Sequence, residues 1–234
     1  PIAAFEDAGW NVQIHGQKSY NGVALLSRVP VEDVRFGFLG ELPNDPDADQ
    51  LGQQKRVISA LVEGVRVVNL YVPNGSSLES DKYQYKLAWL ACLARYINAQ
   101  SDRGELLCVV GDFNIAPENR DMHDPERLNG GVMATTAERE GLKKALAGRL
   151  ADVFRVFEPD AGHWSWWDYR TGAWDRDRGW RIDHIYLCEE LMALARSCTI
   201  HKNVRGNSQP SDHAPVSVEI DWPPAEDEDE QKDD

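Results

Sequence analysis

The sequence predicts an α/β fold in which two mixed β-sheets pack together and helices cover their outer faces. Short apolar runs of strand length alternate irregularly with amphipathic helical stretches along the 234 residues. Some neighbouring runs are joined by a turn and others by a helix, so both antiparallel and parallel pairing are expected. An apolar content of 42% can bury one substantial core, and no linker divides the chain. A single domain over residues 1–222 is therefore expected.

The strands follow from apolar, β-rich runs bounded by turn residues. Residues 57–62 and 65–70 flank the turn-like pair Glu63-Gly64 and read as a hairpin. The run 106–110 is long enough to be a buried strand and stops at a glycine and an aspartate. The remaining expected strands are residues 23–27, 181–187 and 214–220.

Two longer helices follow from spacing and caps. Ser80 is available as the N-cap of an amphipathic helix whose apolar residues recur at helical spacing. Thr135 and Glu138 form a plausible capping box for a second helix through Ala147, and residues 189–195 are expected to form a short one. The apolar positions of the first helix are Tyr83, Leu87, Leu90, Ala94 and Ile97.

The charge is strongly negative and concentrated at one end. The formal net charge is −14, and residues 225–234 hold seven acids and one lysine, which leaves −8 for the rest. Such a segment cannot bury a core, so residues 223–234 are expected to be a disordered acidic tail. An acidic balance argues at first against a nucleic-acid partner, because phosphate contacts come from a basic face.

The cysteines and the hydropathy of the sequence indicate the cellular compartment expected for the protein. The four cysteines form no CxxC pair and no zinc-type spacing, which fits reduced thiols in a cytoplasmic protein. No apolar run approaches the length that spans a bilayer, so no membrane partner is expected.

Polar side chains collect where several apolar strands end. Buried carboxylates at such positions are costly unless they are paired, hydrogen-bonded or bound to a ligand. If these ends meet at one rim, they form a site with three carboxylates, one imidazole, amides and a phenol. The residues are Asn69, Tyr71, Asn74, Asp112, Asn114, Asp183, Asp212 and His213.

This set of side chains suits the hydrolysis of a phosphodiester. A divalent hard cation prefers oxygen ligands, an imidazole can contact the phosphate, and a carboxylate can deprotonate the attacking water. A carboxylate beside a histidine, as Asp183 would be beside His213, favours the imidazolium. Each residue alone has a plain structural alternative, such as a turn cap for Asp112 or Asp212 and packing for Tyr71.

Six stretches of the sequence resemble the exonuclease III / AP endonuclease family of the endonuclease, exonuclease and phosphatase superfamily. They are "HGQKSYNGVALLS", "LYVPNG", "GDFNIAPE", "WSWWDYR", "GWRIDHIYL" and "SDHAPV", and they stand in the family's order. The resemblance implies a four-layered, deoxyribonuclease I-like α/β sandwich. It also implies a DNA repair nuclease that is dependent on Mg2+, with Mn2+ as an alternative, acting as a 3'-5' exonuclease on duplex DNA and as an endonuclease at abasic sites.

The resemblance also assigns roles to individual residues. It gives Asp112 the activation of water, Asn114 a phosphate contact, His213 paired to Asp183 the phosphate, and Tyr71 the same phosphate or its leaving oxygen. It places the metal at Asp212, with Asp112 and Asn114 as further candidates. The implied substrate-binding residues are Asn74, Trp166, Trp180 and Arg181, of which the two tryptophans would wall a pocket for an extrahelical abasic sugar.

One part of the family pattern has no match in this sequence. The resemblance implies an N-terminal asparagine and a metal-binding glutamate, and no residue from 1 to 22 matches either. The 1–222 domain is therefore expected to be N-terminally incomplete. A monomer bound to duplex DNA is expected, associated with the nucleoid if the source is bacterial. Two other hypotheses stay open here: a phosphatase or phosphodiesterase for a small phosphorylated molecule, and a catalytically impaired DNA-binding fragment.

Overall fold

A computed structural model describes residues 2–222, and the expected acidic tail at 223–234 lies outside the described residues. The strands are β1 Asn11–Gly16, β2 Gly22–Ser27, β3 Glu32–Phe36, β4 Val57–Val62, β5 Val65–Tyr71, β6 Leu106–Asp112, β7 Leu150–Asp152, β8 Asp183–Cys188, β9 Ala195–Ile200 and β10 Val216–Ile220. The helices are α1 Ile2–Asp7, α2 Ala48–Gly52, α3 Asp81–Ser101, α4 Pro125–Leu128, α5 Thr136–Leu146, α6 Val153–Phe157, α7 Glu189–Leu194 and α8 Lys202–Arg205.

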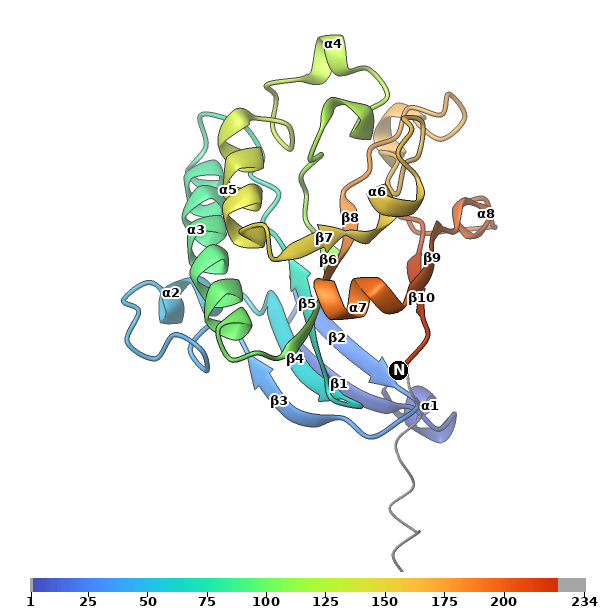
Figure 1. The fold of residues 1–234 in the computed structure, drawn as a ribbon. Coiled ribbons are helices and arrows are strands. Elements are labelled where there is room, and N and C mark those ends of the chain that lie inside the picture. Colours follow the sequence, from blue (N-terminus) through green and yellow to red (C-terminus); the bar gives the residue numbers. More distant parts are fainter. Residues whose placement is uncertain (1, 223–234) are drawn as a thin grey trace, which may run out of the picture.

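A six-stranded mixed sheet forms the centre of the molecule. Its strand order is β3-β4-β5-β6-β8-β7, with β5 and β6 parallel and the other neighbours antiparallel. The turn between β4 and β5 places Glu63 and Gly64 at φ +49° and +79°, as a two-residue hairpin loop of this twist requires. The expected hairpin is thus confirmed, and so is the α/β class with a mixed sheet flanked by helices (Figure 1).

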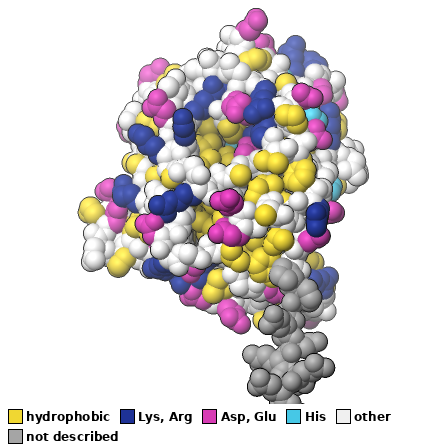
Figure 2. Space-filling view, viewed as in Figure 1, with side chains coloured by type: hydrophobic (Ala, Val, Ile, Leu, Met, Phe, Trp, Pro, Cys, Tyr) yellow, Lys and Arg dark blue, Asp and Glu magenta, His cyan; other side chains and the backbone are white. Residues whose placement is uncertain are grey.

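The two faces of this sheet are covered differently. Alternate residues of β6 point to opposite sides, so Leu107 and Val109 pack under α3 and α5, while Cys108 packs toward Leu191 of α7 and Cys198 of β9. Ser80 caps α3 by accepting a hydrogen bond from the Tyr83 amide, and Thr135 caps α5 with the expected capping box. In Figure 2 the hydrophobic side chains on this face of the molecule gather over α7 and β10.

The second layer of strands differs from the expected second mixed sheet. Within residues 2–222 it consists of two separate antiparallel pairs, β1 with β2 and β9 with β10. No described strand hydrogen-bonds one pair to the other, and each pair packs on the central sheet, β2 over β4 and β5, and β10 over β8.

The state of the cysteines and the apolar character of the helices can be read from the described residues. All four cysteines are free thiols, as their spacing predicted. No helix within residues 2–222 has both the length and the apolar character needed to cross a bilayer.

Candidate active site

The ends of β5, β6 and β8 place three predicted residues side by side. Tyr71 is the register partner of Asp112 in the parallel pair, and Asp112 is the register partner of Asp183 in the antiparallel pair. These three residues and His213 line one open cavity of about 400 Å³. The strand register, rather than sequence proximity, therefore assembles the predicted catalytic group.

Gly111 allows β5 and β6 to approach at this point. It has φ +138°, and a Cβ built on it would lie 2.0 Å from the carbonyl oxygen of Leu70. A side chain would have to push the two strands apart, because the obstacle is backbone. The glycine before Asp112 is thus part of what holds Asp112 next to Tyr71.

His213 and Asp183 form a hydrogen-bonded pair. The Nδ1 of His213 lies 2.8 Å from Oδ2 and 3.0 Å from Oδ1 of Asp183, and the Ser165 hydroxyl donates to Oδ2 at 2.7 Å. Burial alone would lower the pKa of His213. The hydrogen bond to Asp183 and the negative charges of Asp183, Asp112 and Asp212 outweigh burial and raise that pKa to about 9. His213 is therefore an imidazolium at neutral pH, as the sequence predicted.

Asp112 is a half-buried carboxylate close to another negative charge. Burial, together with the charge of Asp183, raises the pKa of Asp112 to about 7. The backbone amide of Asn114 donates to Oδ1 at 2.9 Å, and the Asn114 side-chain amide donates to Oδ2 at 3.0 Å. Asp112 is thus held in one orientation with a pKa suited to proton transfer near neutral pH.

The two predicted asparagines are linked to each other. The side-chain amide of Asn74 donates to Oδ1 of Asn114 at 2.8 Å, and the side-chain amide of Asn114 donates to the Val72 carbonyl at 3.0 Å as well as to Asp112. Both amide hydrogens of Asn114 are therefore engaged within the protein. In this state Asn114 orients Asp112, and a contact to phosphate requires one of these bonds to be exchanged.

The sequence analysis did not identify Lys86, whose side chain donates hydrogen bonds to the backbone carbonyls of both asparagines. Its side chain is fully buried on α3, and Nζ donates to the Asn114 carbonyl at 2.7 Å and to the Asn74 carbonyl at 3.1 Å. Nζ also pairs with the buried Glu138 at 2.5 Å. Asn114 has φ +50°, an uncommon backbone conformation that this lysine helps to hold. A lysine at the apolar spacing of a helix was the signal that could have revealed it.

Arg56 is a second residue that the sequence reasoning missed. Its guanidinium carbon lies 4.7 Å from the centre of the Tyr71 ring, and Nη1 donates to the Tyr71 carbonyl at 3.1 Å. Two further hydrogen bonds, to Gln54 and Asn21, fix the guanidinium. Arg56 thus fixes the position of the Tyr71 ring at the cavity.

The predicted metal residues form a sparse set of oxygen donors. Asp212 accepts a hydrogen bond from Nε1 of Trp166 at 2.9 Å, and within residues 2–222 no three histidine, cysteine, aspartate or glutamate side chains come together as a metal site. Mg2+ fits such a set, because it keeps several waters and is held by one or two carboxylates and the substrate phosphates. The half-buried negative charge of Asp112 beside Asp183 is also a place where a cation is favoured.

Trp166 and Trp180 line a separate, more apolar cavity. They pair as an isolated β-bridge and enclose, with Leu128 and Met133, a volume of about 430 Å³. Trp166 also pairs with His213 through a second bridge, and the two rings lie 6.4 Å apart. The indole-lined cavity is therefore the immediate neighbour of the cavity that contains His213.

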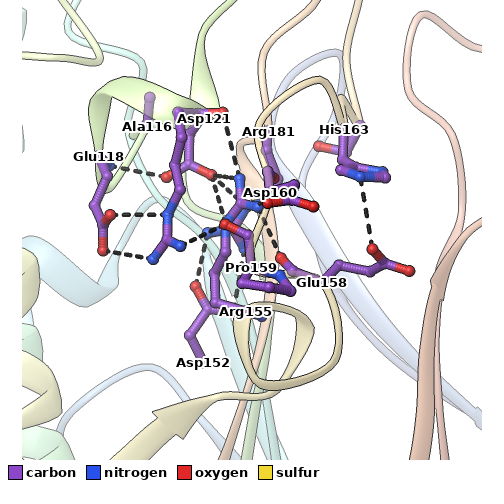
Figure 3. Close-up of polar contacts among 12 residues, drawn as sticks. Ala116, Glu118, Asp121, Asp152, Arg155, Glu158, Pro159, Asp160, His163 and Arg181 are labelled. Atoms are coloured by element: carbon purple, nitrogen blue, oxygen red, sulfur yellow. Dashed lines mark hydrogen bonds and ion pairs between the residues drawn. The ribbon is translucent and has the colours of Figure 1, made fainter.

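Arg181 lies apart from both cavities, in a buried ion-pair network (Figure 3). Its Nε donates to Asp121 at 2.6 Å and its Nη2 to Asp152 at 2.7 Å, and Arg155 donates to the same oxygen of Asp121 at 3.1 Å. The side chain is fully buried, so the geometry gives Arg181 a structural role and offers no surface for the predicted substrate contact.

A pH-dependent stability is expected from His184, which follows Asp183 on β8. Burial and the charge of Arg181 lower the pKa of His184 to about 4, while its ordinary value is 6.5. The unfolded chain therefore binds more protons between these values, and the stability that neutral His184 contributes is lost as pH falls from 6.5 to 4. Chemical denaturation should show that, as pH falls over this range, the wild type loses about 3 kcal/mol of unfolding free energy relative to His184→Gln. A difference independent of pH would contradict it.

Comparison with known proteins identifies the family of this chain. Residues 2–213 match the Endonuclease/Exonuclease/phosphatase family. The exodeoxyribonuclease III of Haemophilus influenzae is 33% identical over 232 residues, which cover 94% of this chain and 84% of that protein. A 3' phosphatase from Neisseria bound to a product DNA hairpin is 39% identical with a TM-score of 0.87, covering 95% of this chain and 83% of that one. An AP endonuclease from Archaeoglobus fulgidus is 35% identical with a TM-score of 0.86, with shares of 95% and 83%. The chain belongs to the endonuclease/exonuclease/phosphatase family and is similar to its exonuclease III and AP endonuclease members.

Proposed function

We propose that this chain is a DNA repair nuclease that hydrolyses DNA phosphodiesters with Mg2+, or with Mn2+ in its place. Its reactions would be incision at abasic sites and removal of nucleotides from the 3' ends of duplex DNA, by a monomer in the cytoplasm. Exodeoxyribonuclease III family enzymes are metal-dependent nucleases, and a similar protein is bound to a DNA hairpin. The observation that carries the proposal is that the half-buried Asp112 and the hydrogen-bonded pair of the His213 imidazolium and the Asp183 carboxylate line one cavity.

Each side chain at the cavity has a role that its chemistry supports. Asp112, when deprotonated, would take a proton from the attacking water, and Asn114 would keep it oriented. The His213 imidazolium would bind the scissile phosphate while Asp183 fixes its ring. Tyr71 would contact the same phosphate or the leaving oxygen, and Asn74 would donate to a phosphate oxygen. Trp166 and Trp180 would enclose the sugar of the flipped nucleotide.

The metal ion would be held by Asp212, with Asp112 and Asn114 as the neighbouring oxygen donors. A bound divalent cation neutralises phosphate charge and lowers the pKa of coordinated water. The protein's own part is to keep these oxygens at the edge of the cavity, as the Trp166 hydrogen bond does for Asp212.

The proposal predicts two cleavage patterns. With Mg2+, the protein should cut a duplex once, beside a single abasic analogue, and should shorten an undamaged duplex from its 3' ends. EDTA should abolish both reactions, and gel electrophoresis of end-labelled strands measures them. A small phosphomonoester offered in parallel should be a poor substrate. Turnover of that compound without DNA cleavage would replace this proposal with the phosphatase hypothesis.

A further inference from the structure

A second cavity adjoins the indole-lined one. It has a volume of about 390 Å³ and is polar, whereas the first, of about 430 Å³, is mainly apolar. The residues that line the polar cavity are His123, Asp124, Arg127, Arg176, Asp177 and Arg178, and all but the two aspartates also line the indole cavity. The two cavities are therefore one continuous depression with an apolar part and an arginine-rich part.

The arginine-rich part has positive charge that its carboxylates do not neutralise. Arg127 pairs with Asp124 at 3.0 Å, but the Asp177 carboxylate accepts hydrogen bonds from Lys202 at 2.8 Å and Trp167 at 3.1 Å. Within residues 2–222 neither Arg176 nor Arg178 forms an ion pair, and the Arg176 guanidinium donates to backbone carbonyls only. Two guanidinium groups thus face a cavity with no carboxylate partner.

The cavities follow one another in a fixed order. The catalytic cavity contains His213 and Asp112, and the indole cavity touches it through Trp166, which bridges to His213 and binds Asp212. The arginine cavity shares lining residues with the indole cavity and none with the catalytic cavity. A strand that places a phosphate at His213 and a sugar between the tryptophans therefore continues toward Arg176 and Arg178.

We propose that Arg176 and Arg178, with Arg127, bind the DNA phosphate on the 3' side of the flipped nucleotide. This inference rests on the proposed function, because removal of a nucleotide from a 3' end breaks the phosphodiester on the 5' side of that nucleotide, and the same cavity is taken to cut on that side of a flipped abasic nucleotide. The next phosphate along the strand then lies on the opposite side of the sugar, and a guanidinium is well suited to bind it. A 3'-terminal nucleotide that ends in a hydroxyl lacks this phosphate. The arginines therefore favour incision at internal sites over removal of terminal nucleotides.

The test compares two substrates that differ only in this phosphate. One duplex carries an internal abasic analogue, and the other ends at the same analogue with a 3' hydroxyl. The double variant Arg176→Ala/Arg178→Ala should lose about tenfold in kcat/KM on the internal site and less than about twofold on the terminal one. The control variant Arg149→Ala/Arg196→Ala removes the same charge from two exposed arginines, 47% and 63% exposed, and should treat both substrates alike. Equal losses of the first variant on both substrates, or no loss on either, would overturn the inference.

Binding without turnover separates this inference from the proposed function. In EDTA, the wild type should bind an internal abasic duplex more tightly than one with a neutral methylphosphonate directly 3' of the analogue. Arg176→Ala/Arg178→Ala should discriminate much less between the two duplexes, because only Arg127, which is paired with Asp124, remains at the phosphate site. If the wild type cuts no DNA with Mg2+ but shows this difference, the proposed function fails and the phosphate site stands. Equal wild-type affinities for both duplexes would overturn the site even if the protein is an active nuclease.

Discussion

Asp112→Asn is expected to lower kcat for abasic-site incision by about 10²–10⁴-fold while DNA affinity stays close to that of the wild type. The amide has the size of the carboxylate and cannot accept the proton of the attacking water. Asp112 lines the cavity and its oxygens already accept hydrogen bonds from Asn114, which the amide of Asn can largely keep, so few DNA contacts are lost. Single-turnover cleavage and fluorescence anisotropy in EDTA would measure the two quantities separately.

The fold of this variant should remain intact. The pKa of Asp112 is raised by desolvation and by the charge of Asp183, so removing the carboxylate charge relieves both unfavourable effects. Asp49→Asn, at an exposed position in α2, is the matched control and should change neither kcat nor affinity. Wild-type turnover in Asp112→Asn would remove this carboxylate from the mechanism and leave the proton to another group.

Asp121→Asn is expected to cost about 3–5 kcal/mol of unfolding free energy, because it removes one partner of a buried ion-pair network. Burial alone would raise the pKa of Asp121, but the charges of Arg181 and Arg155 and their hydrogen bonds lower it. Without that charge, two arginines stay buried with only Asp152 as the remaining carboxylate, which pairs with Arg181. Urea denaturation followed by tryptophan fluorescence measures the change.

The exposed pair of Arg149 and Asp102 provides the comparison for this prediction. Asp102→Asn also removes a carboxylate from an arginine, but the side chains of Arg149 and Asp102 are 47% and 66% exposed, so water replaces the partner. Its midpoint in urea should stay close to that of the wild type. A similar small shift for Asp121→Asn would mean that water reaches the network in Figure 3 and that its charges are not buried in solution.

Much of the fold could be predicted from local signals. The hairpin at Glu63-Gly64, the Ser80 cap and the Thr135 capping box each rest on residues that are adjacent in sequence, and all three are confirmed. The strands β1, β3, β7 and β9 were not predicted, and the last two show why. Strand β7 has only three residues. Strand β9, with the sequence ARSCTI, mixes polar and apolar residues, as suits a strand that is hydrogen-bonded to β10 alone among the described strands. Tertiary pairing decides such segments, and a single sequence does not show it.

Residues of the site could be predicted from the sequence, but the hydrogen bonds and ion pairs that hold them in place could not. Polar residues at strand ends indicated Tyr71, Asp112, Asp183 and His213, and the structure brings these four to one cavity; their catalytic roles stay predictions. Arg181 was misjudged, because a charged residue near aromatic residues looks like a binding group until its buried carboxylate partners are known. Lys86 and Ser165 were missed for a related reason. Each acts through a partner distant in sequence, Asn114 for the lysine and Asp183 for the serine.

Gly111 has a consequence for any experiment that maps function by exhaustive substitution. Every replacement there would bring a Cβ within 2.0 Å of the Leu70 carbonyl, so every library member should fail equally, whatever the chemistry of its side chain. At Asp112, by contrast, failure should depend on whether the new side chain can accept a proton. Equal loss of activity for all substitutions of Gly111 would indicate that the position is needed for strand spacing. Loss of activity that varies with the substituted side chain at Asp112 would indicate a role in proton transfer. A single inactive variant at each position would not distinguish these two requirements.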